Sequence, residues 1–183
     1  MEVGFYFDQA RCIGCYACNV ACRDNYDVDD CSVHWRKVSQ FEWGKYPNVH
    51  LAYVSLSCTH CENPSCAEAC PVSAISKREI DGVMEVDREA CLGAEACTQC
   101  KDACPYGVPQ FSKGEDDKMQ MCTLCVERIE KGVKPVCVDA CPMRALDSGP
   151  LDELKRKYGG IQTTDGFSYS PETRPSIIVK PRY

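Results

Sequence analysis

The residues of this sequence best suited to chemistry are its cysteines, sixteen of which fall into four groups of four. The first group, Cys12 to Cys22, has gaps of two, two and three residues. This spacing is typical of bacterial ferredoxins, in which three thiolates hold one [4Fe–4S] cube and the fourth reaches the neighbouring cube. The groups are Cys12, Cys15, Cys18 and Cys22; Cys58, Cys61, Cys66 and Cys70; Cys91, Cys97, Cys100 and Cys104; and Cys122, Cys125, Cys137 and Cys141. The sequence therefore predicts thiolate-bound iron–sulfur clusters.

Every group ends with a gap of three residues, and the last three groups are followed directly by a proline. A cysteine four positions before the last lies one helical turn away, so the two thiolates point to metal centres on either side of a short helix. Proline suits the next position because it fixes φ and has no amide hydrogen that needs a partner. The first group has Arg23 there instead.

Two other uses of cysteine fit this pattern less well. A disulfide scaffold would need a secreted chain, but no apolar signal segment follows Met1, the seventeen cysteines are odd in number, and they are crowded into runs. Cys122 to Cys141 alone would pass for a zinc site, whereas Cys12 to Cys22 places four ligands within eleven residues, too close together for one tetrahedral ion. Thiols that stay available as ligands indicate assembly in a reducing cytoplasm.

Composition and charge restrict the classes of binding partner. The 183 residues carry a formal net charge of −6, which provides no basic footprint for nucleic acid. No apolar stretch approaches the roughly 20 residues needed to cross a bilayer, so we expect no direct membrane insertion. Four oxidised cubes with their thiolates would lower the charge toward about −14. Partners should therefore present basic surface.

Two phrases recur in the sequence and indicate an internal duplication. A short strand predicted at Val3–Phe7, followed by Asp8, precedes Cys12, and Met84–Cys91 repeats its apolar alternation, aspartate and gap. Cys70–Ile75 likewise resembles Cys141–Leu146. A hairpin is predicted between the two phrases of the central copy, with Ala74–Ile80 and Val83–Val86 as arms and Asp81-Gly82 as the turn.

The remaining elements are less regular. Val49–Leu56 alternates as a strand does, and Pro150–Tyr158 reads as a short helix with an acidic first turn and a basic last turn. Asp24–Lys45 has no clear period, and we expect a loop or insertion that covers a cluster. Ile161–Tyr183 holds three prolines around the triplet Ile177–Val179, which predicts an extended tail, mobile alone, that lies on another protein.

The sequence resembles the iron–sulfur electron-transfer subunits of the dimethyl sulfoxide reductase family of molybdopterin oxidoreductases. The resemblance rests on the order of the four groups, on the run Cys58-Thr59-His60-Cys61-Glu62-Asn63-Pro64-Ser65-Cys66 and on the closing Cys-Pro-Met-Arg-Ala-Leu. The resemblance covers about Phe5 to Gly149. It implies a loop-rich α+β fold of two ferredoxin-like modules, with short β-hairpins and short helices around four clusters. The outer module would comprise residues 1–57 with 119–150, the inserted module 58–118, and residues 151–183 a C-terminal helix and partner-binding tail.

The resemblance also implies four ligand sets, each drawn from two groups. Set 1 is Cys12, Cys15, Cys18 and Cys141; set 2 is Cys58, Cys61, Cys66 and Cys104; set 3 is Cys91, Cys97, Cys100 and Cys70; set 4 is Cys122, Cys125, Cys137 and Cys22. We refer to the clusters they would hold as clusters 1 to 4.

The third group departs from the family pattern, because the expected first ligand falls on Ala94 and Cys91 stands three residues earlier. Either the loop Leu92–Ala96 bulges so that Cys91 reaches iron, or this site holds a [3Fe–4S] cluster. Gly93 permits an unusual turn, which favours Cys91 as a ligand of a fourth [4Fe–4S] cluster.

Four further residues lie near ligands or remain unassigned. We expect His60 to hydrogen-bond cluster sulfur or backbone without binding iron. Cys31 is left over and is expected to be inert, since no catalytic histidine can be assigned beside it. Tyr16 and Tyr106 are expected to shield clusters from water.

The predicted function is a relay of single electrons through the four clusters, between a large molybdopterin (Mo or W) catalytic subunit and a soluble electron carrier or a membrane anchor. No catalytic residue is expected on this chain. Two alternatives remain: a free polyferredoxin without a fixed partner, and a radical enzyme with one open-site cluster. The chain is expected in the cytoplasm or at a membrane through a partner, and export together with a partner is also compatible with the sequence.

Overall fold

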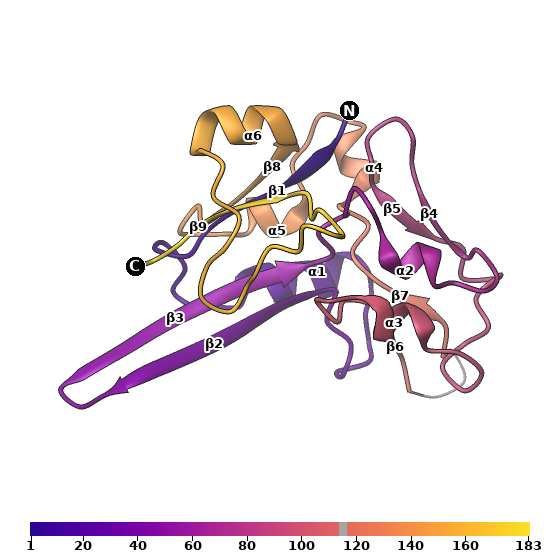
Figure 1. Cartoon of the computed structure of the whole chain (residues 1–183), viewed down its shortest axis with the longest axis horizontal. Coiled ribbons are helices and arrows are strands. Elements are labelled where there is room, and N and C mark those ends of the chain that lie inside the picture. The colour runs from indigo at the N-terminus through magenta and orange to yellow at the C-terminus, as the bar shows by residue number, and fades with distance from the viewer. Residues whose placement is uncertain (114–116) are drawn as a thin grey trace.

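The computed structural model describes residues 1–113 and 117–183 as a loop-rich α+β fold with four small sheets and six short helices (Figure 1). The elements are β1 (Val3–Asp8), α1 (Ala17–Asn25), β2 (Arg36–Lys45), β3 (Asn48–Ser57), α2 (Ser65–Glu68), β4 (Ile75–Lys77), β5 (Met84–Val86), α3 (Gln99–Ala103), β6 (Gln110–Phe111), β7 (Met119–Gln120), α4 (Val126–Ile129), α5 (Val136–Asp139), β8 (Leu146–Pro150), α6 (Leu151–Tyr158) and β9 (Ile177–Lys180). The predicted fold class is confirmed.

The largest sheet has the order β8-β1-β9, with β1 antiparallel to β8 and parallel to β9. All six residues of β1 are buried, because alternate side chains face opposite sides of a strand and both sides are covered. Phe5 and Phe7 belong to the main core, whereas Tyr6 packs with Leu154 in a second core under α6. In Figure 1, α6 lies above this sheet, and α1 and the base of the β2–β3 hairpin lie below it. The short helix α5 contacts β8.

The duplicated phrases form the same unit twice. The strand after Cys70 (β4) pairs antiparallel with the strand before Cys91 (β5), just as β8 after Cys141 pairs with β1. In both units the backbone N–H of the aspartate, Asp87 or Asp8, donates to an alanine carbonyl at 2.8 Å. The predicted hairpin and the predicted strand at Val3–Phe7 are therefore confirmed. The elements between residues 58 and 118 lie together on the right of Figure 1.

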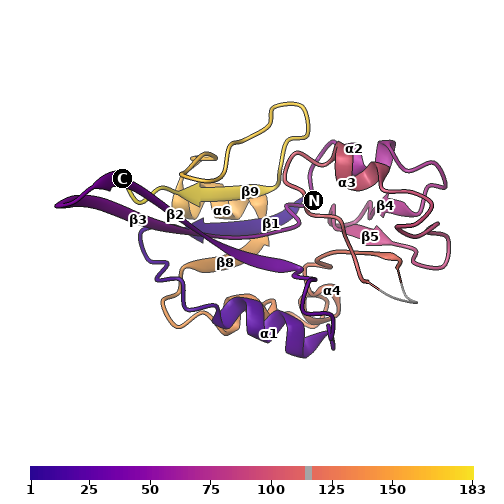
Figure 2. The ribbon, with the colours of Figure 1, turned by 90° about the horizontal axis from the view of Figure 1, so that it is seen from below.

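The prediction of an irregular segment at Asp24–Lys45 was wrong for its second half. Residues 36–45 form β2, which pairs over its full length with β3 from Arg36 opposite Ser57 to Lys45 opposite Asn48. The hairpin extends well beyond the rest of the chain (Figure 2). Only its base is buried, so the burial pattern of β2 alternates over a few residues and then becomes exposed on both faces. That short alternation is the reason why the sequence showed no period.

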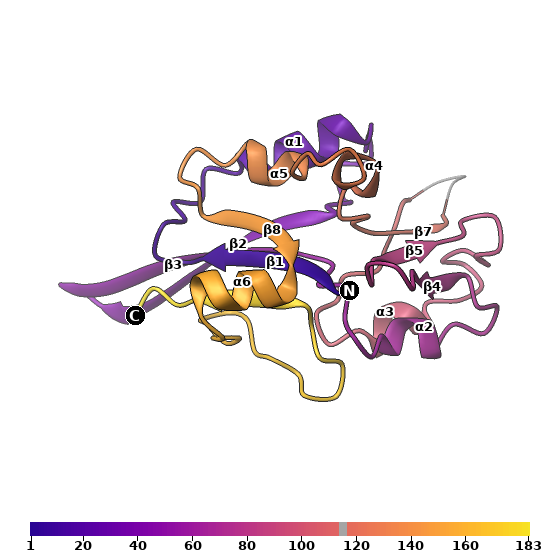
Figure 3. The ribbon, with the colours of Figure 1, turned by 90° about the horizontal axis from the view of Figure 1, so that it is seen from above.

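The C-terminal segment is also not the free tail that the sequence suggested. Ile177, Ile178 and Val179 are 3 %, 0 % and 2 % exposed and form β9 beside β1. The segment between α6 and β9 runs out toward the elements α2 and α3 and returns, as Figure 3 shows. A four-residue buried strand between prolines has the same sequence pattern as an exposed apolar triplet, so only the tertiary pairing distinguishes them.

Within the described residues, no helix combines the length and the apolar character needed to cross a lipid bilayer.

Candidate iron–sulfur cluster sites

All seventeen cysteines are unpaired. Two pairs of short helices carry the thiols that the spacing predicts to point to different centres. On α1, Cys18 belongs to set 1 and Cys22 to set 4, and α1 packs against α5, which carries Cys137 of set 4 just before Cys141 of set 1. The same exchange joins α2 and α3, so each helix pair ties two distant groups together.

Set 1 lines one cavity. The walls include Cys12, Cys15, Cys18 and Cys141 together with apolar side chains of β1, β2 and β8. The loop after Cys12 turns at Gly14, which has a φ of +67°. A Cβ added at Gly14 would clash with the ring of Tyr53 on β3, so the hairpin holds this loop closely.

Set 3 lines a second cavity, and it includes Cys91. The walls are formed by Cys70, Cys91, Cys97 and Cys100 with apolar neighbours from β4, β5, β6 and β7. The loop after Cys91 bends at Gly93, with a φ of +88°, in the way that the bulge alternative requires.

In sets 2 and 4, electrostatic effects between the buried thiols indicate that they lie close together. Burial raises the pKa of the Cys22 thiol, and so do three neighbouring thiols, those of Cys122, Cys137 and Cys125. Burial and then two thiols of set 2 raise the pKa of Cys66 to about 12: Cys104 and Cys61. Each implied set of four thiols is thus brought together, including the ligand that comes from a distant group.

The four sets follow one another in space. Cys18 of set 1 lies close enough to Cys137 of set 4 for the second thiol to raise the pKa of the first, after the effect of burial. Cys122 of set 4 likewise raises the pKa of Cys58 of set 2. Cys100 of set 3 raises the pKa of Cys66 of set 2. The spatial order is therefore 1, 4, 2, 3.

Comparison with known proteins identifies relatives of this chain. Residues 49–151 match the 4Fe-4S dicluster domain. An anaerobic dimethyl sulfoxide reductase chain from Escherichia coli is 39% identical over 188 residues, covering 98% of this chain and 89% of the relative. The Haemophilus influenzae protein of the same name is also 39% identical, with the same coverage of both proteins. A sulfite dehydrogenase subunit from Allochromatium vinosum is 31% identical over 99% of this chain and 83% of its own length.

The chain belongs to the iron–sulfur electron-transfer subunits of the dimethyl sulfoxide reductase family. It is an electron-transfer subunit that carries [4Fe–4S] clusters, and catalysis lies on a separate chain.

Three buried polar atoms test whether the iron–sulfur subunit is shaped for such clusters. Among the described residues, the buried side-chain atoms without a hydrogen-bond partner are Arg36 Nε, His60 Nε2 and Thr173 Oγ1. Each belongs to a residue beside predicted ligands: Arg36 acts on thiols of sets 1 and 4, His60 lies between two ligands of set 2, and Thr173 lies against Cys61. Buried polar atoms normally have partners, and cluster sulfur would serve as one. The donor set therefore fits the cofactor.

The backbone also directs amides at ligand sulfurs. Such N–H···S hydrogen bonds favour the thiolate and affect the reduction potential of a bound cluster. They run from Ala74 to Cys70 (3.3 Å), from Leu124 to Cys122 (3.3 Å), from Ala145 to Cys141 (3.3 Å), from His60 to Cys58 (3.4 Å) and from Met119 to Cys91 (3.5 Å).

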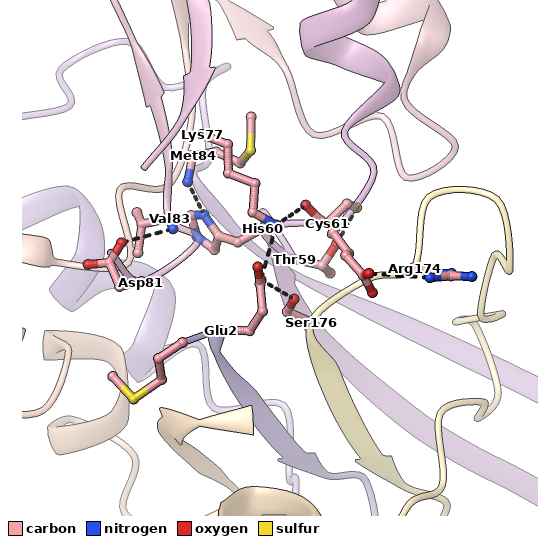
Figure 4. Close-up of polar contacts among 12 residues, drawn as sticks. Glu2, Thr59, His60, Cys61, Lys77, Asp81, Val83, Met84, Arg174 and Ser176 are labelled. Carbon is pink, nitrogen blue, oxygen red and sulfur yellow. Dashed lines mark hydrogen bonds and ion pairs between the residues drawn. The ribbon is translucent and has the colours of Figure 1, made fainter. Parts of the chain in front are cut away.

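His60 behaves as a hydrogen-bonding residue, as the sequence predicted. Its Nδ1 accepts the backbone N–H of Met84 at 3.0 Å, so Nε2 carries the proton of the neutral ring (Figure 4). Burial, and then the charges of Lys77 and Arg36, lower the pKa of His60 to about 3. The neutral ring thus keeps a buried Nε2–H without a hydrogen-bond partner in the described part of the chain.

The C-terminal segment supports the loop of Cys58 and Cys61, a role that sequence reasoning missed. The N–H of Ser176 donates to Thr59 O at 2.9 Å, and that of Asn63 donates to Thr173 O at 3.0 Å. Lys77 bridges the carbonyl of Cys61 and the carboxylate of Glu2, to which Ser176 Oγ also donates. These contacts join sequence positions far apart, so no local pattern could have revealed them.

The three other side chains singled out by the sequence are placed as follows. Tyr16 lines the set 1 cavity, but the residue is 46% exposed and shields it only in part. Tyr106 stacks on Phe167 with ring centroids 5.0 Å apart. Cys31 is exposed and lines neither cysteine cavity.

Proposed function

We propose that the chain relays single electrons through four [4Fe–4S] clusters held by sets 1 to 4. The partners would be a molybdopterin (Mo or W) catalytic subunit at one end and a soluble carrier or membrane anchor at the other. The observation that carries the proposal is the convergence of thiols from distant groups into each set, since Cys141 completes set 1 and Cys70 completes set 3. When bound, each cluster accepts and passes one electron.

The spatial order of the sets suits a linear wire. Set 1 and set 3 are its two ends, with sets 4 and 2 between them. Exposed apolar side chains line the set 1 cavity at the first end, among them Ile13 at 55% and Met143 at 41% exposure. At the other end Leu92, which lines the set 3 cavity, is 48% exposed. Apolar surface at both ends is what two docking partners would cover.

We also propose that Cys91 completes set 3, so that this site holds four irons. Burial, and then three thiols, raise the pKa of Cys100 to about 11: Cys70, Cys91 and Cys97. Lys118 Nζ donates to the Cys91 carbonyl at 2.6 Å and supports the bulged loop. The two equivalent strand pairs support the proposed division into an outer module, residues 1–57 with 119–150, and an inserted module, 58–118.

The substrate of the complex is a property of its catalytic chain. Relatives of similar length are named for dimethyl sulfoxide reductase and for sulfite dehydrogenase, so similar iron–sulfur subunits belong to enzymes named for different substrates. The exposed apolar side chains at the ends of the wire favour a fixed partner. The C-terminal segment packs on its own chain.

Anaerobic purification through an affinity tag on this chain tests the proposal. We expect a large subunit with molybdopterin and Mo or W to co-purify in a one-to-one ratio. Recovery of the cluster-loaded chain alone, from cells that also produce a molybdopterin catalytic subunit, would instead identify a free polyferredoxin.

A further inference from the structure

Arg36, the first residue of β2, has a fully buried positive charge. The residue is 2% exposed. Its Nη1 donates to Ser55 O and Ser55 Oγ, both at 3.3 Å, and its Nη2 donates to Ser57 Oγ at 2.8 Å. The guanidinium lies 4.5 Å from the centre of the Phe5 ring. All of these partners are neutral.

Within the described residues, no Asp or Glu forms an ion pair with Arg36. The groups that act on its charge are instead the thiols of two neighbouring ligand sets. These are the thiols of Cys18 of set 1 and of Cys22, Cys122 and Cys137 of set 4. Ser55 Oγ links Arg36 Nη1 to Cys18 Sγ, at 3.3 Å from each. A buried charge without a counter-charge strongly destabilises a fold, so this arginine requires negative charge at those thiols.

We propose that Arg36 is the shared counter-charge of clusters 1 and 4 and raises the reduction potential of both. The inference rests on the proposed function, because it needs clusters at sets 1 and 4. An oxidised cube with its four thiolates carries a charge of about −2, and reduction adds one more negative charge. A fixed positive charge in a medium of low dielectric constant stabilises the reduced state more than the oxidised one.

Ser55 extends the effect to a ligand of cluster 1 alone. Its hydroxyl oxygen accepts from Arg36 and lies 3.3 Å from Cys18 Sγ. A serine hydroxyl has a single hydrogen, so while it accepts from Arg36 it can donate that hydrogen to the sulfur. Hydrogen bonds to ligand sulfur are one of the means by which a protein sets cluster potential. Arg36 thus acts on two clusters, and Ser55 on one of them.

The arrangement has a consequence for the wire. Clusters 1 and 4 are consecutive, so one charge raises the reduction potentials of two adjacent clusters. Electrons are then stabilised at the end of the wire that contains set 1.

The test is a redox titration of the cluster-loaded chain in its complex, followed by electron paramagnetic resonance. The variants are Arg36→Gln, which removes the charge, Arg36→Lys, which keeps it, and Ser55→Ala. Lys37→Gln is the matched control, since Lys37 is the next residue of β2 and is exposed. Iron content is measured for every variant.

We expect Arg36→Gln to lower the ratio of reduced to oxidised cluster at least about tenfold at two of the four sites, equivalent to about 59 mV for a one-electron couple. Arg36→Lys should keep all four potentials within about threefold in that ratio, equivalent to less than the same 59 mV. Ser55→Ala should shift only one of the two sites that respond to Arg36→Gln, and Lys37→Gln none.

Unchanged potentials in Arg36→Gln, or equal shifts at all four sites, would overturn the inference. If Arg36→Gln fails to retain clusters while Arg36→Lys retains all four at unchanged potentials, the charge is the property required and the inference stands. Loss of clusters in both variants would assign Arg36 to folding alone and overturn it. Failure of the proposed function is separate, because it would be seen as missing clusters in the unsubstituted chain.

Discussion

Truncation of Ile178 to alanine tests whether β9 holds the C-terminal segment on the fold. Ile178 is 0% exposed and packs with Tyr6 and Leu154 between the sheet and α6. Removal of a buried isoleucine side chain down to Cβ lowers stability by about 2–5 kcal/mol, because apolar contacts are lost and a cavity remains. The matched control is Ile161→Ala, at a residue of the same type and segment that is 50% exposed. Its effect should stay within about 0.5 kcal/mol.

The assay is the guanidinium chloride concentration at which half of the cluster absorbance is lost after a fixed anaerobic incubation. With a denaturant dependence of about 4 kcal/mol per molar, the expected loss of stability lowers the midpoint by roughly 0.5–1.2 M for Ile178→Ala. The control should shift it by no more than about 0.1 M. Equal midpoints for the two variants would refute the docking of β9 and restore the free tail that the sequence suggested.

Three further predictions concern the cluster sites. Deletion of residues 161–183 should reduce iron content, because this segment hydrogen-bonds the loop that carries Cys58 and Cys61; unchanged iron in the truncated chain would contradict that role. Cys91→Ser should convert one cluster to a three-iron centre or lose it, while Cys31→Ser leaves iron unchanged, and equal iron loss in both would refute the assignment of set 3. Gly14→Ala should weaken iron binding at set 1, since φ is +67° there and the added Cβ would clash with an aromatic ring; spectra identical to those of the unsubstituted chain would show that the loop adapts.

The cysteine sites were the part of the molecule most open to prediction. Each short gap in a group follows from the geometry of a single helix turn or loop, so the spacing of Cys12 to Cys22 already describes local structure. The Asp81-Gly82 turn between two apolar runs predicted the pairing of β4 with β5. The equivalent pairing of β8 with β1 joins the matching segments of the duplication.

The features that sequence reasoning missed depend on contacts between distant segments. In β2, Arg36 and Lys37 are adjacent basic residues, yet one is buried and the other exposed. The difference arises from the pairing with β3, which places Ser55 and Ser57 around the guanidinium. Likewise, Ile178 is buried only because β1 has an edge available for a parallel strand. Neither fact leaves a local signal in the sequence.

The most direct test of the four-cluster wire is the iron and acid-labile sulfide content of the anaerobically purified chain, with Mössbauer spectra to assign the cluster type. The four ligand sets predict about sixteen iron and sixteen sulfide per chain, all in [4Fe–4S] cubes. About fifteen iron with a three-iron spectrum would contradict Cys91 as a ligand. Bound zinc with little iron, or only about eight iron in two cubes, would contradict the wire itself.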